Sequence, residues 1–291
     1  MGVRRAYGAM TARTLIELRD RFAALPPPVV VFNKSHSGSR LLARLLDASG
    51  VFMGAARNES GDALPVLKLV RYFVEHYHPD ASALWDAGRP VDGALLGLVE
   101  GVFADHLRGH DGRQPWGWKL CETVYALPLI DLLFPGARFV HLIRDGRDVA
   151  FSDHVAPVEP FWQKVFVDAV GVGRWRGLAY GTMARIGYRL DAPRYNMQHW
   201  CNSVSLGRRY GAMLRHRYLE VRYEALCGAF EAEAARVLAF AAVPDAAAGI
   251  AALKDEVSLD AVGKFRRQPW WRRARVESYG RPLLKSLGYD T

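Results

Sequence analysis

Short runs of apolar residues alternate along the chain with longer segments in which apolar residues recur every three or four positions. The short runs are typical of buried strands, and the longer spacing is typical of helices with one buried face. The pattern predicts strands at 29–32, 116–120, 137–144 and 217–226. It predicts helices at 15–25, 39–48, 63–78, 93–108, 124–134, from about 145 onward, and at 229–241. Short strands that alternate with helices favour a parallel sheet covered on both faces, so we expect an α/β fold.

This alternation stops between residues 155 and 200, a stretch rich in Trp, Tyr, Gly and Arg. We interpret it as an inserted helical segment. The chain has 291 residues, of which 50% are hydrophobic, so it can bury one large core. We therefore expect a single domain over 1–291 that contains this insertion.

The net charge is +9, which favours an anionic partner such as a nucleotide, an acidic sugar or a membrane surface. The three cysteines are too widely spaced to form a metal site or a disulfide framework, which favours a reducing compartment. The first residues lack the apolar stretch of a signal peptide, and no run approaches the roughly 18 apolar residues of a membrane span. We expect a cytoplasmic protein without stable membrane insertion.

The turn after the first predicted strand has the composition of an anion-binding loop. Its sequence, KSHSGSR at 34–40, lies between a strand and a helix. The backbone N–H groups of Ser37, Gly38, Ser39 and Arg40 can converge there on an anion at the helix N-terminus. An ordinary turn with Ser37 as the helix cap would have the same pattern. We do not expect this loop to bind a nucleoside triphosphate, because the motif of such loops, G-x-x-x-x-G-K-[ST], is absent.

A second segment carries another candidate anion site. Arg144 ends a predicted strand, and Ser152 follows eight residues later on the next predicted helix. Two helical turns bring that hydroxyl back toward the same edge of the sheet, where it and the arginine fork can grip a phosphate. Taken alone, the segment is better explained as a surface cluster of ion pairs among Arg144, Asp145, Arg147 and Asp148.

Together, in this order and about 110 residues apart, the two segments resemble the sulfotransferases that use 3′-phosphoadenosine 5′-phosphosulfate (PAPS). In that family a loop of the [KR]-x-G-[TS] kind binds the 5′-phosphosulfate, and R-[DN]-x-x-[DE]-x-x-x-S binds the 3′-phosphate. The stretches GWKLCETVYALPLIDLLFPGARFVHLIRD, YLEVRYEAL and VGKFRRQ are similar to further family segments. The motifs are closest to those of bacterial-type and carbohydrate, heparan-type members.

The resemblance implies a P-loop-like parallel sheet and a different binding role for each of three parts of the chain. Residues 28–154 would bind the phosphosulfate and the 3′-phosphate, 155–200 would face the acceptor, and 217–270 would hold the adenine and a basic C-terminal loop. Tyr223 would lie near the adenine, and Lys264 and Arg266 near the 3′-phosphate. The implied products are 3′-phosphoadenosine 5′-phosphate (PAP) and an acceptor sulfated on a hydroxyl or an amine. The acceptor would be a small molecule, a glycan or a lipid-linked metabolite.

One departure from the family pattern concerns the cation at the oxygen that bridges sulfate and phosphate. The family has Lys or Arg just before the S-G-[TS] turn, where this chain has His36, with Lys34 two residues earlier. We expect His36 and Lys34 to share this role. Lys119, in the WGWKL strand, matches the family lysine near the transferring group.

The base that takes the acceptor's proton must be a histidine or a carboxylate near the acceptor. Glu59 is the leading candidate, because the heparan-type relatives have a glutamate at a similar distance after the loop, here 23 residues after His36. The K-x-H stretch that supplies a histidine in small-phenol sulfotransferases is absent. Asp62, His106 and His110 remain alternatives.

Two other kinds of function are compatible with parts of the sequence. A nucleotide or sugar kinase would have a related fold, but the Walker lysine and a Mg²⁺-binding Ser/Thr and Asp pair are lacking. A non-catalytic polyanion-binding protein would account for the charge but leaves the two ordered motifs unexplained. We expect neither a metal nor a nucleic-acid partner.

Overall fold

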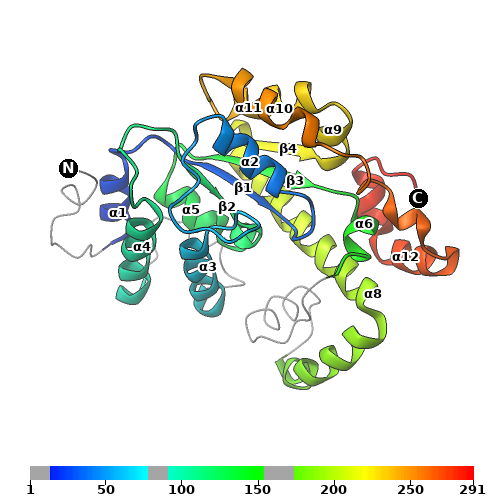
Figure 1. Cartoon of the computed structure of the whole chain (residues 1–291). Coiled ribbons are helices and arrows are strands. Elements are labelled where there is room, and N and C mark those ends of the chain that lie inside the picture. The colour runs from blue at the N-terminus through cyan, green and yellow to red at the C-terminus, as the bar shows by residue number, and fades with distance from the viewer. Residues whose placement is uncertain (1–13, 78–90, 154–173) are drawn as a thin grey trace.

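The computed structural model describes residues 14–77, 91–153 and 174–291, and for 174–189 only the backbone. Four parallel strands form its sheet, in the order β2-β1-β3-β4 (Figure 1). These are β1 (Val29–Asn33), β2 (Gly117–Lys119), β3 (Arg138–Ile143) and β4 (Tyr218–Arg222). Because the strands run the same way, their carboxyl ends share one edge, which is where open α/β sheets bind ligands.

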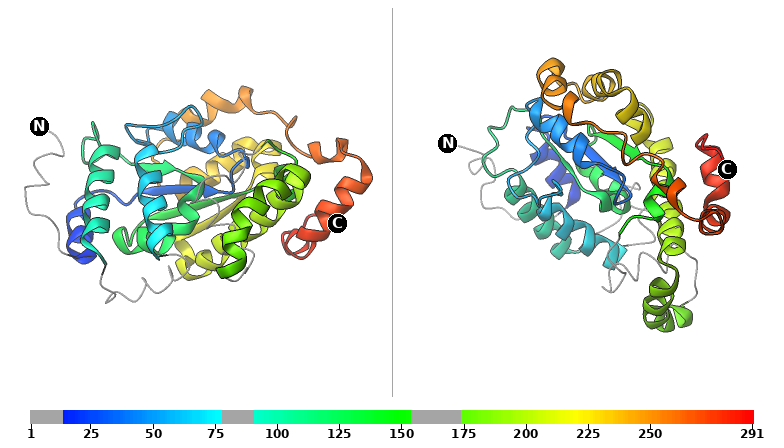
Figure 2. Two further views of the ribbon diagram at one scale, coloured as in Figure 1. Left: turned by 90° about the horizontal axis from the view of Figure 1, so that it is seen from below. Right: turned by 45° about the vertical axis from the view of Figure 1, so that its right-hand side comes forward.

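Helices cover both faces of the sheet, as the pattern predicts (Figure 2). Val30 and Phe32 of β1 pack into one apolar cluster, and their neighbours Val29 and Val31 pack into the other. The first cluster is completed by α1 (Leu15–Phe22), α3 (Leu64–Tyr77), α4 (Gly93–His106) and α5 (Leu127–Leu133). The second is completed by α2 (Arg40–Ala48), α9 (Tyr223–Gly228), α10 (Phe230–Phe240) and α11 (Ala246–Leu253).

A third apolar cluster lies beyond the end of β3 and joins three helices. They are α6 (Gly146–Ala150), α8 (Arg174–Leu214) and the C-terminal α12 (Trp270–Ser286). The α8 helix is interrupted at Asp191, whose φ of −149° and ψ of 58° are not helical. Short 3₁₀ helices complete the description: η3 (Cys121–Ala126), η4 (Arg215–Arg217), η5 (Lys254–Glu256) and η6 (Lys264–Arg267).

The expected α/β fold, a P-loop-like parallel sheet between helices, is confirmed. The last strand is shorter than predicted, because β4 ends at Arg222 and Tyr223 begins α9. Of the expected insertion at 155–200, residues 155–173 lie outside the described chain, and the remainder belongs to the long α8.

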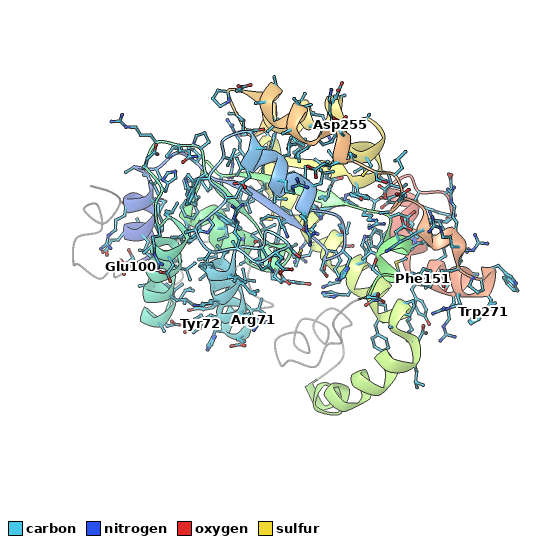
Figure 3. The ribbon with its side chains drawn as sticks, viewed as in Figure 1. Arg71, Tyr72, Glu100, Phe151, Asp255 and Trp271 are labelled. Atoms are coloured by element: carbon cyan, nitrogen blue, oxygen red, sulfur yellow. The ribbon has the colours of Figure 1, made fainter. Side chains whose placement is uncertain are left out.

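Two tryptophans at the start of α12 are more exposed than most of their kind. Trp270 is 73% exposed and Trp271 57%, and Figure 3 shows Trp271 projecting outward from the helix. No helix of the described residues is long and apolar enough to cross a membrane.

Candidate functional site

The loop between β1 and α2 presents unpaired backbone donors at the start of a helix. The N–H group of Ser37 bonds the carbonyl of Lys34 at 3.2 Å, and the Ser37 hydroxyl bonds the same oxygen at 2.6 Å. Within the described chain, the N–H groups of Gly38, Ser39 and Arg40 have no such partner. Unpaired N–H donors at a helix N-terminus favour the binding of an anion.

The close approach of Tyr223 explains why a glycine occupies position 38. Gly38 has a φ of +87°, and a Cβ added there would lie 2.2 Å from Cε2 of Tyr223. The ring of Tyr223 also lies under the guanidinium of Arg144, with Cζ 4.8 Å from the ring centroid. The first loop, the end of β3 and the start of α9 therefore meet at one point.

Arg144 connects the loop to the C-terminal part of the chain. Its Nη1 donates to the carbonyl of His36 at 3.1 Å, and its Nη2 donates to the carbonyl of Ala261. The arginine is only 5% exposed, so its charge is held in a fixed place. The sequence-predicted partners of the two motifs thus lie side by side.

Asp148 holds the basic C-terminal loop in place. Its carboxylate accepts hydrogen bonds from the N–H groups of Gly263 and Phe265, both at 2.8 Å. Lys264 lies between these two residues, and its Nζ donates to Oγ of Ser152 at 2.9 Å. The Ser152 hydroxyl in turn donates to the carbonyl of Asp148 at 2.9 Å. Arg144, Ser152 and Lys264 are therefore all arranged around Asp148. Arg266 is exposed and has no described contact with these three residues.

Charges converge on His36 from three parts of the chain. Burial and the nearby charges of Lys34, Lys264 and Arg144 together lower the pKa of His36 to about 4, while Asp153 acts in the opposite direction. The imidazole is therefore neutral at pH 7 in the ligand-free protein, so it can donate one hydrogen bond but supplies no charge. His36 also has a φ of 68°, an unusual backbone conformation for a residue other than glycine.

Lys34 supplies the positive charge that His36 lacks. Its side chain is buried and its Nζ donates to the hydroxyl of Ser35. Burial lowers the pKa of Lys34 to about 8, while Cys121 and Glu122 act in the opposite direction. Lys34 is thus mostly protonated at pH 7.

Lys119 ends β2 and is paired with an acid that the sequence analysis left as an alternative. Its Nζ donates to Oδ1 of Asp62 at 2.7 Å, and the lysine side chain is 2% exposed. Glu59 lies on the same loop as Asp62 but is exposed, and it lines a surface hollow that includes Arg40 and Gly61. Arg40 itself reaches back from α2 to the hydroxyl of Ser60 at 3.3 Å.

The two histidines considered as bases are engaged in packing. Nε2 of His106 bonds the carbonyl of Gly117 at 3.0 Å, and Nε2 of His110 bonds that of Gln114 at 2.8 Å. Both side chains are buried, and burial lowers the pKa of His106 to about 4. Both rings also pack against aromatic side chains, His106 against Trp118 and His110 against Phe52.

Sequence reasoning missed Glu122, which lies three residues after Lys119. It lines a small cavity together with Lys34, and its carboxyl interacts with the charges of Lys34, Lys119 and Asp62. The K-x-x-E spacing was visible in the sequence. Only the fold brings that carboxyl beside the first loop, because β2 and β1 are neighbours in the sheet.

A profile of the Sulfotransferase family matches residues 27–247, which include the first loop, Arg144, Ser152 and Tyr223. The chain belongs to the sulfotransferase family. The match covers all four described strands and both candidate anion-binding motifs. A search among curated proteins finds no significant match.

Solved sulfotransferases have a similar fold at low sequence identity. The sulfotransferase domain of the Synechococcus PCC 7002 olefin synthase is 15% identical, with a TM-score of 0.50 over 92% of this chain and 96% of that one. The sulfotransferase domain from the curacin biosynthetic pathway is also 15% identical, with a TM-score of 0.49 over 91% and 99% of the two chains. Sulfotransferase STF9 from Mycobacterium avium is 12% identical, with a TM-score of 0.47 over 99% and 80%.

The candidate site combines unpaired backbone amides with cations that have acids beside them, Asp148 near Arg144 and Glu122 near Lys34. Among the described residues no group of three or more His, Cys, Asp or Glu side chains is arranged to hold a metal ion. The groups gathered at this site include the loop amides, the hydroxyls of Ser37 and Ser152, and the cations Lys34, Arg144 and Lys264.

Proposed function

We propose that this sulfotransferase moves a sulfuryl group from PAPS to a hydroxyl or amine of an acceptor, a small molecule, glycan or lipid-linked metabolite, and releases PAP. The cytoplasm is the proposed compartment, where the three free cysteines would stay reduced.

The convergence of Lys34, Arg144 and Lys264 on His36 is the observation that supports this proposal most strongly. These cations come from three distant parts of the sequence. Asp148 and Asp153 offset part of their mutual repulsion, and an anion bound among them would offset more of it. A nucleotide with phosphate groups at both its 3′ and 5′ positions carries enough negative charge to use them all.

Each proposed binding residue has a distinct role. The amides of Gly38, Ser39 and Arg40, the Ser37 hydroxyl and Lys34 would bind the 5′-phosphosulfate. Arg144, Ser152 and Lys264 would bind the 3′-phosphate, with Arg266 as an outer cation. Tyr223 would lie against the nucleotide near its adenine, as the resemblance implies.

The residues nearest the transferring group would stabilise charge rather than form bonds to it. PAPS supplies the activated sulfuryl group, and the protein positions it and neutralises the charge that develops on the leaving phosphate. Lys34 and Lys119 would supply that charge, and neutral His36 would donate a hydrogen bond. The resemblance implies Glu59 as the base.

A kinase is the main competing proposal, and nucleotide binding separates the two. Calorimetry with PAP and with ATP should give tight binding of PAP and much weaker binding of ATP. A preference for ATP that requires Mg²⁺ would favour the kinase. Salt-sensitive binding of any polyanion without nucleotide preference would favour a non-catalytic binding protein.

A further inference from the structure

A small cavity lies at the carboxyl ends of β1 and β2, beside the first loop. Its wall is formed by β1 and the loop, by η3 and by α8. The lining side chains are Asn33, Lys34, Ser35, Cys121, Glu122, Tyr125, His199 and Ser203. Most of these groups can donate or accept hydrogen bonds, which distinguishes the cavity from a packing defect in an apolar core.

Asn33 leaves a hydrogen-bond acceptor unused in this cavity. The residue is 2% exposed, and its Nδ2 donates to the carbonyl of Lys34 at 2.5 Å. Its Oδ1 is buried and has no partner in the described chain. A buried polar atom without a partner is unfavourable, so a ligand hydroxyl that donates to Oδ1 would be bound favourably.

The wall opposite β1 is a connected set of polar side chains. The hydroxyl of Tyr125 bonds Nε2 of His199 at 2.9 Å and Oγ of Ser203 at 3.1 Å. All three side chains are buried, so α8 and η3 are fixed to each other at this point. The cavity is therefore formed before any ligand arrives.

Glu122 contributes the carboxylate of this cavity. Burial raises the pKa of Glu122 and nearby Asp62 raises it further, whereas Lys34 and Lys119 act in the opposite direction. A carboxylate that interacts with both lysines lies beside the groups proposed to hold the sulfuryl group. Raised basicity is also what a proton acceptor at neutral pH requires.

We propose, on the basis of the sulfotransferase function proposed above, that this cavity receives the nucleophilic hydroxyl of the acceptor and that Glu122 takes its proton. The acceptor oxygen forms a bond to sulfur while the bond from sulfur to the bridging oxygen breaks. The electron pair of that bond stays on the leaving phosphate, and the hydroxyl proton moves to the Glu122 carboxylate. Asn33 accepts a hydrogen bond from another O–H group of the acceptor and orients it.

Water can test the base without knowledge of the natural acceptor. Release of labelled sulfate from PAPS into water is measured for the wild type and for Glu122→Gln, Glu122→Asp, Glu59→Gln and Glu231→Gln. Glu231 lies exposed on α10 and serves as the matched control. We expect Glu122→Gln to lose about 10²-fold or more, Glu122→Asp to recover part of that loss, and Glu231→Gln to match the wild type.

A titration distinguishes a base from a residue that only maintains the fold. Nuclear magnetic resonance of ¹³C-carboxyl-labelled glutamate, with Glu122→Gln to identify the signal, should give a Glu122 pKa above the ordinary value. Wild-type sulfate release by Glu122→Gln, or a larger loss in Glu59→Gln, would overturn the inference. So would a Glu122 signal that titrates at or below the ordinary value, or a wild type that binds PAP but releases no sulfate above background.

Calorimetry with PAP on the same variants keeps this inference apart from the proposed function. A wild type that does not bind PAP would contradict the proposed function itself. A wild type that binds PAP, together with a fully active Glu122→Gln, would contradict only the assignment of the base.

Discussion

The two sides of the site differ in how their charges are balanced. On the β3 side, the Asp148 carboxylate accepts hydrogen bonds from two backbone N–H groups at 2.8 Å and lies 3.5 Å from Arg144. This carboxylate neutralises only part of the combined positive charge of Arg144 and Lys264. On the β2 side, Lys119 is paired with Asp62 at 2.7 Å, and Glu122 lies near both. An excess of positive charge suits the binding of an anion, whereas a balanced set of acids and bases suits the transfer of a proton.

The largest effect is expected from removal of the carboxylate that organises the β3 side. Asp148→Ala would leave the N–H groups of Gly263 and Phe265 without a partner next to a buried arginine. The free energy of unfolding should fall by about 3–5 kcal/mol, measured by urea denaturation. The control is Asp105→Ala, which removes an exposed ion pair with Arg108 and should cost about 0–1 kcal/mol. Equal losses in the two variants would mean that Asp148 has no organising role.

A smaller effect is expected where the first loop meets Tyr223. Gly38→Ala would place a methyl group against the ring and strain a φ of +87°, so PAP affinity should fall about tenfold or more. Gly109 is the matched control, because its φ is +88° and an added Cβ would meet nothing within 4 Å. Gly109→Ala should lose about 1–2 kcal/mol of stability while its affinity for PAP stays unchanged. Similar affinity losses in both variants would mean that strain, and not the contact with Tyr223, is responsible.

The sequence was informative where function depends on residues at fixed spacing. Arg144 follows β3, and Ser152 lies just beyond the short α6 and not on a helix as predicted. Both side chains bond Asp148, so their spacing was enough to predict that they lie near one another. The role of Gly38 could be predicted in the same way, because a glycine in a turn between a strand and a helix allows a close approach to the backbone.

The contacts on the β2 side could not be predicted from the spacing of residues in the sequence. The contact of Lys119 with Asp62 joins residues 57 positions apart, and its formation depends on how the loop after α2 returns to the sheet edge. Asp148 occupies the acidic position of the Arg144 motif, but its partners could not be predicted, because Gly263 and Phe265 lie more than 100 residues further along the chain. Spacing alone cannot identify contacts of this kind.

The smallest expected effect is the pH dependence of binding. The pKa of His36 is about 4, so PAP affinity should not fall between pH 6 and 7.5 through loss of a histidine charge. The pKa of Lys34 is about 8, lowered by burial, so its charge is present below pH 8 and lost above it. Affinity should therefore decline above pH 8, and Lys34→Arg should shift that decline to higher pH. A decline centred near pH 6.5 that disappears in His36→Lys would instead assign the charge to His36.

Recognition of the 3′-phosphate by Arg144 and Ser152 tests the account most directly. Calorimetry compares PAP with adenosine 5′-phosphate, which lacks the 3′-phosphate, in the wild type, Arg144→Ala, Ser152→Ala and the control Arg138→Ala. Arg138 lies at the opposite end of β3 from Arg144. We predict that Arg144→Ala and Ser152→Ala each lose about 1.5–3 kcal/mol of binding free energy for PAP and almost none for adenosine 5′-phosphate, while Arg138→Ala loses neither. Equal losses for both nucleotides, or a wild type that does not distinguish them, would contradict the account.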